Sequence, residues 1–295
     1  MWGEGSALLA AALWAVGSIL LTSQTRWIDP IPLSALRCLV ATAFIAILLP
    51  PLGAIGELRD LSLNTAVSMV GSGILAMGLG DTLYIASLGM IGVSRAFPIS
   101  MSSYPLVTFL LAVSLLDESL SWVVLLGAIL IIVGVSVLVV EGRAQVTGGA
   151  ELRRGSPGRG VVFVLLAALF WALSTIWLKA GSGDLNAAAA SSLRIPAAGL
   201  FMLLLARGRL GELRVVTGGW RTLATVALAG ILGTGVGGLL YVYAVQEAGA
   251  GRAAILSSTS PLFVLPLAVF FLSERLTLWV LLGTVVSIVG IWLVI

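Results

Sequence analysis

The stretch LLGAILIIVGVSVLV at 125–139 reappears at the end of the chain as LLGTVVSIVGIWLVI at 281–295. Both copies are apolar almost throughout, and both have glycine at the third and tenth positions. Self-similarity at a fixed spacing is the sequence signature of an architecture built from a repeated unit. The fold therefore depends on how far this duplication extends.

The duplication extends through most of the chain. SALR at 34–37 returns as SSLR at 191–194, and GLGDTLY at 78–84 returns as GVGGLLY at 235–241, both 157 positions later. Pro105-Leu106 returns as Pro261-Leu262 at a spacing of 156, so one residue has been lost near Ser103. The pattern predicts two copies of one helix bundle.

The composition indicates a membrane protein. Hydrophobic residues make up 59% of the chain, charged residues make up 10%, and the mean hydropathy is +1.14. Soluble proteins are about half apolar and a quarter charged. The net charge of +3 is too small and too scattered to indicate nucleic-acid binding. With Cys38 as the single cysteine and no histidine, we expect no intrachain disulfide, no metal site and no cofactor.

The apolar stretches have the length of membrane spans, since a helix needs about 20 apolar residues to cross the hydrocarbon core. Ten spans can be delimited, at 6–24, 31–50, 65–87, 96–116, 121–140, 161–179, 187–206, 222–244, 253–272 and 277–295. The N-terminus lacks the basic segment of a cleaved signal peptide, so we expect the first stretch to remain as a helix.

The polar, glycine-rich segment 141–160 divides these spans into five and five. We expect one five-helix repeat at 1–140, a linker at 141–160 and a second repeat at 161–295. Because each repeat has an odd number of spans, the second must enter the membrane from the opposite side. The expected fold is an all-α integral membrane protein with ten transmembrane helices arranged as two inverted five-helix repeats. Inverted repeats can form two related conformations, one open to each side, which is the geometry of alternating access.

Each repeat also ends in the pattern R-A…S-x-x-P-L…(D/S)-E-x-L-(S/T)…L-L-G…I-V-G. This pattern resembles the EamA group of the drug/metabolite transporter superfamily. The matching residues are Arg95, Ala96, Pro105, Leu106, Glu118, Leu120, Gly127 and Gly134 in the first repeat, and Arg252, Ala253, Pro261, Leu262, Glu274, Leu276, Gly283 and Gly290 in the second. The resemblance covers essentially the whole chain. It implies a ten-helix carrier with a central cavity, usually exporting amino acids or other small metabolites.

Three charged residues lie well inside the predicted spans: Arg37, Asp81 and Arg194. A buried charge costs several kcal/mol, so each should have a partner. Arg37 and Asp81 lie at similar depth from one face, roughly 9 Å at the helical rise, so they can form a pair. Their repeat equivalents are Arg194 and Gly238, so the second repeat keeps the cation and lacks the anion. Either these charges are structural, or Asp81 titrates during transport, or Arg194 meets an anionic substrate group.

Aromatic and hydroxyl residues at equivalent places of the two repeats are candidates for a substrate path. Met77, Asp81 and Tyr84 share one helix face, and Thr234 and Tyr241 share another. Hydroxyl-rich stretches precede Pro105 and Pro261, where the backbone carbonyls freed by proline must be satisfied by neighbours or face a wet cavity. Close packing around glycines, or kinked helices with hydroxyls bonded to their own backbone, would be the structural explanation. The candidate substrate-binding residues are Trp14, Met77, Asp81, Tyr84, Ser102, Ser103, Tyr104, Trp171, Arg194, Thr234, Tyr241, Ser258 and Thr259.

Other repeated residues have structural interpretations. The glycines at 127, 134, 283 and 290 mark one face of the last helix of each repeat, which predicts packing within the monomer or between monomers. Glu118 and Glu274 precede the last helix of each repeat, where a carboxylate can stabilise a helix N-terminus.

The arginines predict an orientation. The face that holds both termini has three basic residues in its loops and flanks: Arg59, Lys179 and Arg252. The opposite face has eleven: Arg26, Arg95, Arg143, Arg153, Arg154, Arg159, Arg207, Arg209, Arg214, Arg221 and Arg275. The positive-inside rule places the eleven in the cytoplasm and both termini outside, whereas the resemblance implies termini inside. We expect a multi-pass protein of a prokaryotic cytoplasmic membrane.

The favoured function is secondary transport of a small metabolite, most simply by export, with lipid around the protein and protons as a possible coupling ion. Uptake, drug efflux and lipid flipping are the alternatives, and an enzyme is disfavoured because the sequence has no histidine and no paired intramembrane carboxylates. The sequence leaves the substrate, the direction and the oligomeric state open, a monomer included.

Overall fold

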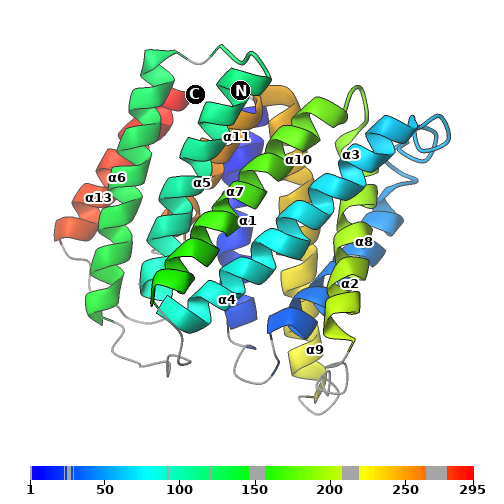
Figure 1. Ribbon diagram of the computed structural model, residues 1–295, viewed down its shortest axis with the longest axis horizontal. Helices are drawn as coiled ribbons and strands as arrows, with labels where there is room; N and C mark the ends of the chain where they lie inside the picture. The colour runs from blue at the N-terminus through cyan, green and yellow to red at the C-terminus, as the bar shows by residue number, and fades with distance from the viewer. Residues whose placement is uncertain are drawn as a thin grey trace.

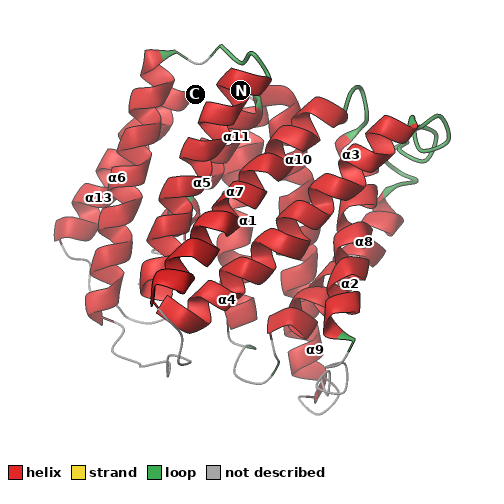
Figure 2. Cartoon of the chain, in the orientation of Figure 1, coloured by secondary structure: helices red, strands yellow, loops and turns green. Residues whose placement is uncertain are grey.

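The computed structural model describes residues 2–22, 24, 28, 30–91, 93–119, 121–145, 157–207, 219–263 and 278–295. These residues are helical apart from short connections, and no strand occurs among them (Figure 2). The α-helices of the first half are α1 (Trp2–Thr22), α2 (Pro30–Leu48), α3 (Leu63–Gly73), α4 (Asp81–Ile91), α5 (Val93–Leu115) and α6 (Trp122–Gln145). Those of the second half are α7 (Pro157–Gly181), α8 (Ala187–Ala206), α9 (Gly219–Ala229), α10 (Gly238–Ala248), α11 (Ala250–Ser257) and α13 (Leu278–Val294).

The helices form one bundle in which both termini lie at the same end (Figure 1). Helices from the two halves pack against each other: α6 along α13, α2 along α8, α5 along α7, and α1 along α10. The α6–α13 pair lies at one edge of the bundle, and the α2–α8 pair lies at the other (Figure 1). The centre of the bundle is therefore an interface between the halves.

Two π-helical segments interrupt the long helices at matching places. The segment η1 (Ile74–Gly80) joins α3 to α4, and η4 (Gly230–Gly237) joins α9 to α10. A π-helix has wider turns than an α-helix and is frequent at functional sites. The expected spans 65–87 and 222–244 are thus each a helix with a π-helical segment in the middle. The sequence pattern did not predict this feature.

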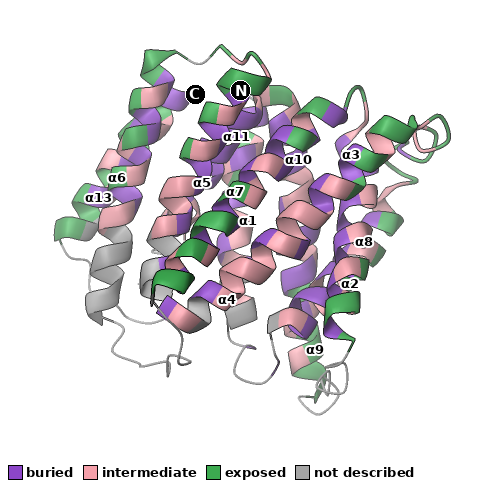
Figure 3. Cartoon of the chain, viewed as in Figure 1, coloured by how far each residue is buried: buried purple, intermediate pink, exposed green. Residues whose placement is uncertain are grey.

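The outer faces of the helices are apolar. Exposed side chains include Leu110, Val133, Leu200, Leu228 and Trp292, and Figure 3 shows exposed positions along α6 and α13 and buried ones gathered between the inner helices. Five described helical windows are long and apolar enough to cross a membrane: Ile31–Leu48, Leu63–Ser87, Gly158–Gly181, Ala187–Ala206 and Gly219–Ala248. An apolar exterior around a partly polar interior is the arrangement that a bilayer favours.

The repeated glycines of α6 and α13 serve packing within the chain. A Cβ atom at Gly127 would lie 2.7 Å from the carbonyl oxygen of Gly290, and a Cβ at Gly134 would collide with Ser287. The two backbones therefore approach as closely as small residues allow. This is the first of the two packing arrangements that the sequence left open.

Glu118 contacts a different helix from the expected one. Its carboxylate oxygens accept hydrogen bonds from the backbone N–H groups of Ala250 (2.6 Å) and Gly251 (3.1 Å), at the N-terminus of α11. The helix it stabilises thus belongs to the other half, because the fold brings the turn after α5 against the start of α11. Glu274, Leu120 and Leu276 lie outside the described residues.

The expected span at 253–272 is interrupted by a turn in its described part, after which residues 260–263 are again helical. Helix α11 ends at Ser257, and turn residues follow at 258–259. Pro261 cannot donate to the carbonyl of Ser257, four residues earlier. The hydroxyl of Ser260 donates to that carbonyl at 3.0 Å, so the freed group is satisfied locally. Residues 264–277 and the central part of the linker, 146–156, lie outside the described residues.

Candidate functional site

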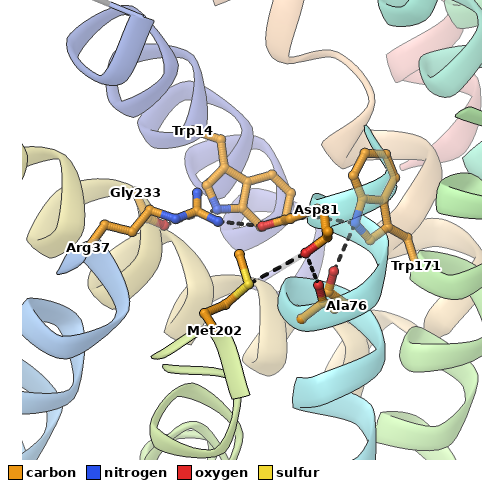
Figure 4. Close-up of polar contacts among 9 residues, drawn as sticks. Trp14, Arg37, Ala76, Asp81, Trp171, Met202 and Gly233 are labelled. Atoms are coloured by element: carbon orange, nitrogen blue, oxygen red, sulfur yellow. Dashed lines mark hydrogen bonds and ion pairs between the residues drawn. The ribbon is translucent and has the colours of Figure 1, made fainter. Parts of the chain in front are cut away.

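An ion pair lies at the centre of the bundle. The Arg37 guanidinium on α2 donates to the carboxylate of Asp81, the first residue of α4. The indole Nε1–H of Trp171, on α7 in the other half, approaches the second carboxylate oxygen of Asp81 at 3.1 Å and the carbonyl oxygen of Ala76 at 3.2 Å. Figure 4 shows the Arg37 side chain reaching Asp81 from one side and Trp171 from the other. Asp81 is therefore held by groups from both halves.

This ion pair is only partly buried. The side chains of Arg37 and Asp81 are 19% and 21% exposed, respectively, although both lie in apolar helices. A pair in such surroundings interacts more strongly than one in bulk water, yet a small polar molecule can approach it. The pair can thus serve as a structural link or as a group that exchanges partners.

Trp14 makes the equivalent contact in the other half. Its indole Nε1–H on α1 donates to the carbonyl oxygen of Gly233 at 3.0 Å, inside η4 (Figure 4). Trp14 and Gly233 are the repeat equivalents of Trp171 and Ala76, each displaced by 157 positions. Each tryptophan thus reaches from the first helix of one half to the π-helix of the other half. There it bonds a carbonyl that also accepts the backbone N–H five residues further on, from Asp81 to Ala76 and from Gly238 to Gly233.

Aromatic side chains surround both tryptophans. The Trp14 ring lies 5.1 Å from that of Tyr241, and the Trp171 ring lies 5.3 Å from that of Tyr84. Tyr104 meets Trp171 edge-on at 6.1 Å. Tilted and edge-to-face pairs at these separations are favourable for aromatic rings. Four of the predicted aromatic residues are therefore brought into two matching clusters with the fifth, Tyr104, beside them.

A cluster of hydroxyl groups lies in the interior between the halves. The Tyr104 and Tyr241 hydroxyls are hydrogen-bonded to each other, and the Thr175 hydroxyl lies 3.2 Å from the first and 3.0 Å from the second. The Thr175 hydroxyl also bonds the carbonyl of Trp171 at 3.0 Å. Tyr104, Thr175 and Tyr241 are buried. Hydroxyls both donate and accept, so this cluster can adjust to either kind of ligand atom.

Arg194 is buried among neutral groups. Its side chain on α8 is 6% exposed. It donates to the hydroxyl of Ser72 at 2.6 Å and approaches that of Ser174 at 3.5 Å. Within the described part of the chain, no carboxylate lies within 4 Å of this guanidinium. The cation thus has hydroxyl acceptors and no counter-charge.

Close backbone approach sets the positions of both arginines. A Cβ at Gly73 would collide with the backbone of Arg194, and a Cβ at Gly230 would lie 2.8 Å from the carbonyl oxygen of Arg37. Gly73 and Gly230 are repeat equivalents, and each precedes or begins a π-helix. Glycine at these places lets each arginine-bearing helix pack against the π-helix of the opposite half.

The remaining predicted residues have local contacts. Met77 packs beside the apolar cluster of Cys38, Ala41, Ile45 and Ile195. The buried hydroxyls of Ser258 and Thr259 donate to the carbonyls of Ile255 (2.7 Å) and Leu256 (2.6 Å) of their own segment. Thr234 is buried in η4, and Ser102 and Ser103 are half-buried on α5. The structure does not bring these residues to the ion pair by any described hydrogen bond.

Sequence reasoning missed three residues that bind the central groups: Ser72, Ser174 and Thr175. Their signal was a hydroxyl side chain in an apolar helix, which is weak because such residues often bond their own backbone. Among the described residues, no three histidine, cysteine or acidic side chains are placed to hold a metal ion.

An apolar helix bundle with an ion pair, a buried arginine and a hydroxyl cluster between its two halves is a polytopic membrane protein with a polar interior. The chain belongs to the EamA-like transporter family, whose model matches residues 1–140 and 158–295. It is a membrane transporter of the drug/metabolite type, a class that is generally not enzymatic.

One relative and one solved structure are similar to this chain along nearly its whole length. An uncharacterized transporter of Archaeoglobus fulgidus is 28% identical over 296 residues, which cover 97% of this chain and 95% of the relative. A solved crystal structure, described only as that of a protein, has a TM-score of 0.77 at 18% identity, covering 99% of this chain and 95% of its own. The second likeness shows the fold alone.

Proposed function

We propose that the chain moves a small metabolite, an amino acid or a similar compound, across the membrane by alternating access between two inverted repeats, and that it exports this compound. The observation that carries the mechanism is the reciprocity of the central contacts. Trp14 bonds η4 and Trp171 bonds η1, and Gly73 and Gly230 each face the arginine of the opposite half. A two-fold relation between repeats produces such pairs of contacts, in which the same contact occurs again with the two halves exchanged.

The alternation follows from that relation. Two equivalent halves can form the same contacts in two conformations of the bundle, one closed towards each side of the membrane. At the end that holds the termini, the structure links the halves by three contacts: Glu118 with the N-terminus of α11, Glu4 with Arg252 (3.5 Å), and Glu57 with the N–H of Asn186 (2.6 Å). These links support a closed gate at this end. The gate opens when the halves rock apart there and close at the opposite end.

A reversible cross-link tests the gate. A Cβ at Gly3 would lie 2.9 Å from that of Ala248, so a small shift brings a cysteine pair there to the distance of a disulfide. Gly3→Cys with Ala248→Cys, made on Cys38→Ala, is expected to stop transport when oxidised and to recover it when reduced. Each single cysteine variant is the control. Undiminished transport by the fully oxidised pair would contradict alternating access through this gate.

A substrate panel tests the export itself. Cells with and without the protein are loaded with amino acids and other small metabolites, and their release is followed. We expect faster release of a subset of these compounds from cells that contain the protein. Faster entry of the same compounds, with no change in release, would show an uptake carrier instead.

A further inference from the structure

We propose that the transported molecule carries a carboxylate and that Arg194 binds this group in the space beside Gly238. The inference rests on the proposed transport function and adds the chemical class of the substrate. Two interior sites occupy equivalent positions in the two halves. The first contains the carboxylate of Asp81, and the second has Gly238 at the same position.

The first site shows how this interior holds a carboxylate. Asp81 is bound by the Arg37 guanidinium and by the Trp171 indole N–H. Tyr84, one turn further along α4, packs on the Trp171 ring. An arginine, an indole donor and a tyrosine thus surround the anion, and charge-assisted hydrogen bonds of this kind are about twice as strong as neutral ones.

The second half has a repeat equivalent of every cation, donor and ring of the first site. The equivalents of Arg37, Trp171 and Tyr84 are Arg194, Trp14 and Tyr241, and Tyr241 packs on Trp14 as Tyr84 packs on Trp171. The indole edge of Trp14 lies against Gly237, since a Cβ there would be 3.1 Å from Nε1. The carboxylate alone is missing, because Gly238 replaces Asp81.

The place of the missing side chain is open. A Cβ at Gly238 would meet no heavy atom within 4 Å, whereas most inner glycines of η1 and η4 face a neighbour directly. Gly238 and Tyr241 are three residues apart on α10, so they share a helix face. Arg194 approaches the hydroxyl of Ser174 at 3.5 Å, and the hydroxyl of the adjacent Thr175 lies 3.0 Å from that of Tyr241. The open space therefore adjoins the cluster in which the buried arginine lies.

The charge of Arg194 favours an anionic occupant. Hydroxyls of Ser72 and Ser174 are its acceptors, and no carboxylate of the described residues compensates the positive charge. A buried cation without a counter-ion is costly, and a guanidinium can bind both oxygens of a carboxylate at once. A substrate carboxylate beside Gly238 would compensate the charge as Asp81 does in the first site.

A pair of substitutions of equal size tests the placement without any ligand. Gly238→Asp should put a tethered carboxylate beside Arg194, while Gly238→Asn should put a neutral group of the same shape there. We expect the Asp variant to unfold several degrees above the Asn variant in detergent, and this difference to vanish when Arg194→Gln is added to both. A difference that is absent, or that survives Arg194→Gln, would overturn the placement.

Matched ligands test the substrate class on the unmodified protein. Phenylacetate, leucine and succinate are compared with phenylacetamide, leucinamide and succinamide by thermal shift and by transport into vesicles. We expect at least one acid to stabilise the protein more than its amide, with affinity about ten- to a hundredfold lower in Arg194→Gln and in Gly238→Asp. Gly238→Asn fills the same space but leaves the charge of Arg194, so it should lower the affinity less than Gly238→Asp does. If no acid exceeds its amide, the carboxylate class is wrong. If amides are transported as readily as acids, the carboxylate class is wrong and the proposed transport function stands. If the protein transports none of these compounds, the proposed transport function is contradicted instead.

Discussion

At the scale of single residues, the two intramembrane arginines have different surroundings despite their equivalent positions. Arg37 has Asp81 as a counter-ion, whereas the partners of Arg194 within the described ranges are hydroxyl groups. The energy of a charge in a low-dielectric interior depends on its neighbours. The two sites therefore differ because one position is Asp81 in the first half and glycine in the second: the first site is neutralised and the second is charged.

The role of Asp81 can be tested by removing its charge. If Asp81 couples transport to a proton gradient, Asp81→Asn should abolish accumulation against a gradient and spare downhill exchange. If the pair is structural, the same change should leave Arg37 unpaired and destabilise the fold by about 3 kcal/mol. Unfolding temperature and proteoliposome transport distinguish these results.

The double variant Arg37→Gln, Asp81→Asn is the control for the structural role, because it removes both charges and should regain part of the lost stability. A single variant that folds normally and still accumulates substrate would rule out both roles for Asp81.

The tyrosines provide a second test at this scale. If the rings line the path, Tyr84→Ala or Tyr241→Ala should lower transport at least about tenfold. Each substitution also removes a ring that packs on a tryptophan. Tyr84→Phe and Tyr241→Phe keep the ring and separate its packing from its hydroxyl. Expression in the membrane is measured alongside, and normal transport by both alanine variants would place the path elsewhere.

At the scale of elements, the bundle is held by helix pairs that each take one helix from either half. Backbones in these pairs approach closely because glycines lie at the contact, as in α6 and α13. In a bilayer, where apolar side chains gain little by leaving lipid, such close packing is a main source of helix association.

Gly134→Ala should therefore destabilise the α6–α13 pair. The added methyl would collide with Ser287 and the backbone of Gly283, and overpacking of this kind costs typically 1–3 kcal/mol. Gly5→Ala, at a helical position where a Cβ meets nothing within 4 Å, is the matched control and should be neutral or slightly stabilising. Thermal unfolding in detergent measures both, and an equal effect of the two substitutions would contradict this account of the contact.

At the scale of the whole molecule, both termini lie at one end of the bundle (Figure 1). The predicted spans assign eleven basic residues of loops and flanks to the opposite end and three to this one. Since basic residues in short loops remain in the cytoplasm, the distribution favours termini outside.

A labelling experiment decides this orientation. Gly148→Cys on a Cys38→Ala background places a single thiol in the linker. We expect it to resist an impermeant thiol reagent in intact cells and to react after the membrane is permeabilised. A cysteine at Trp2, at the other end, should show the reverse. Ready labelling of position 148 from outside would place the termini in the cytoplasm.

The amino-acid sequence by itself determined the class of protein, the helical composition and the family, because apolar stretches of span length and a repeat at 157 positions do not depend on tertiary contacts. It also indicated that Arg37 could reach Asp81, since helical rise alone fixes their depth. Tertiary structure decided the rest. The π-helices lie within single repeats, but the hydropathy pattern did not show them. The contacts of Trp14 and Trp171 across the halves, and the capping of α11 by Glu118, join residues from different repeats. Such contacts depend on how the two halves pack, and periodicity within one helix carries no information about its partner.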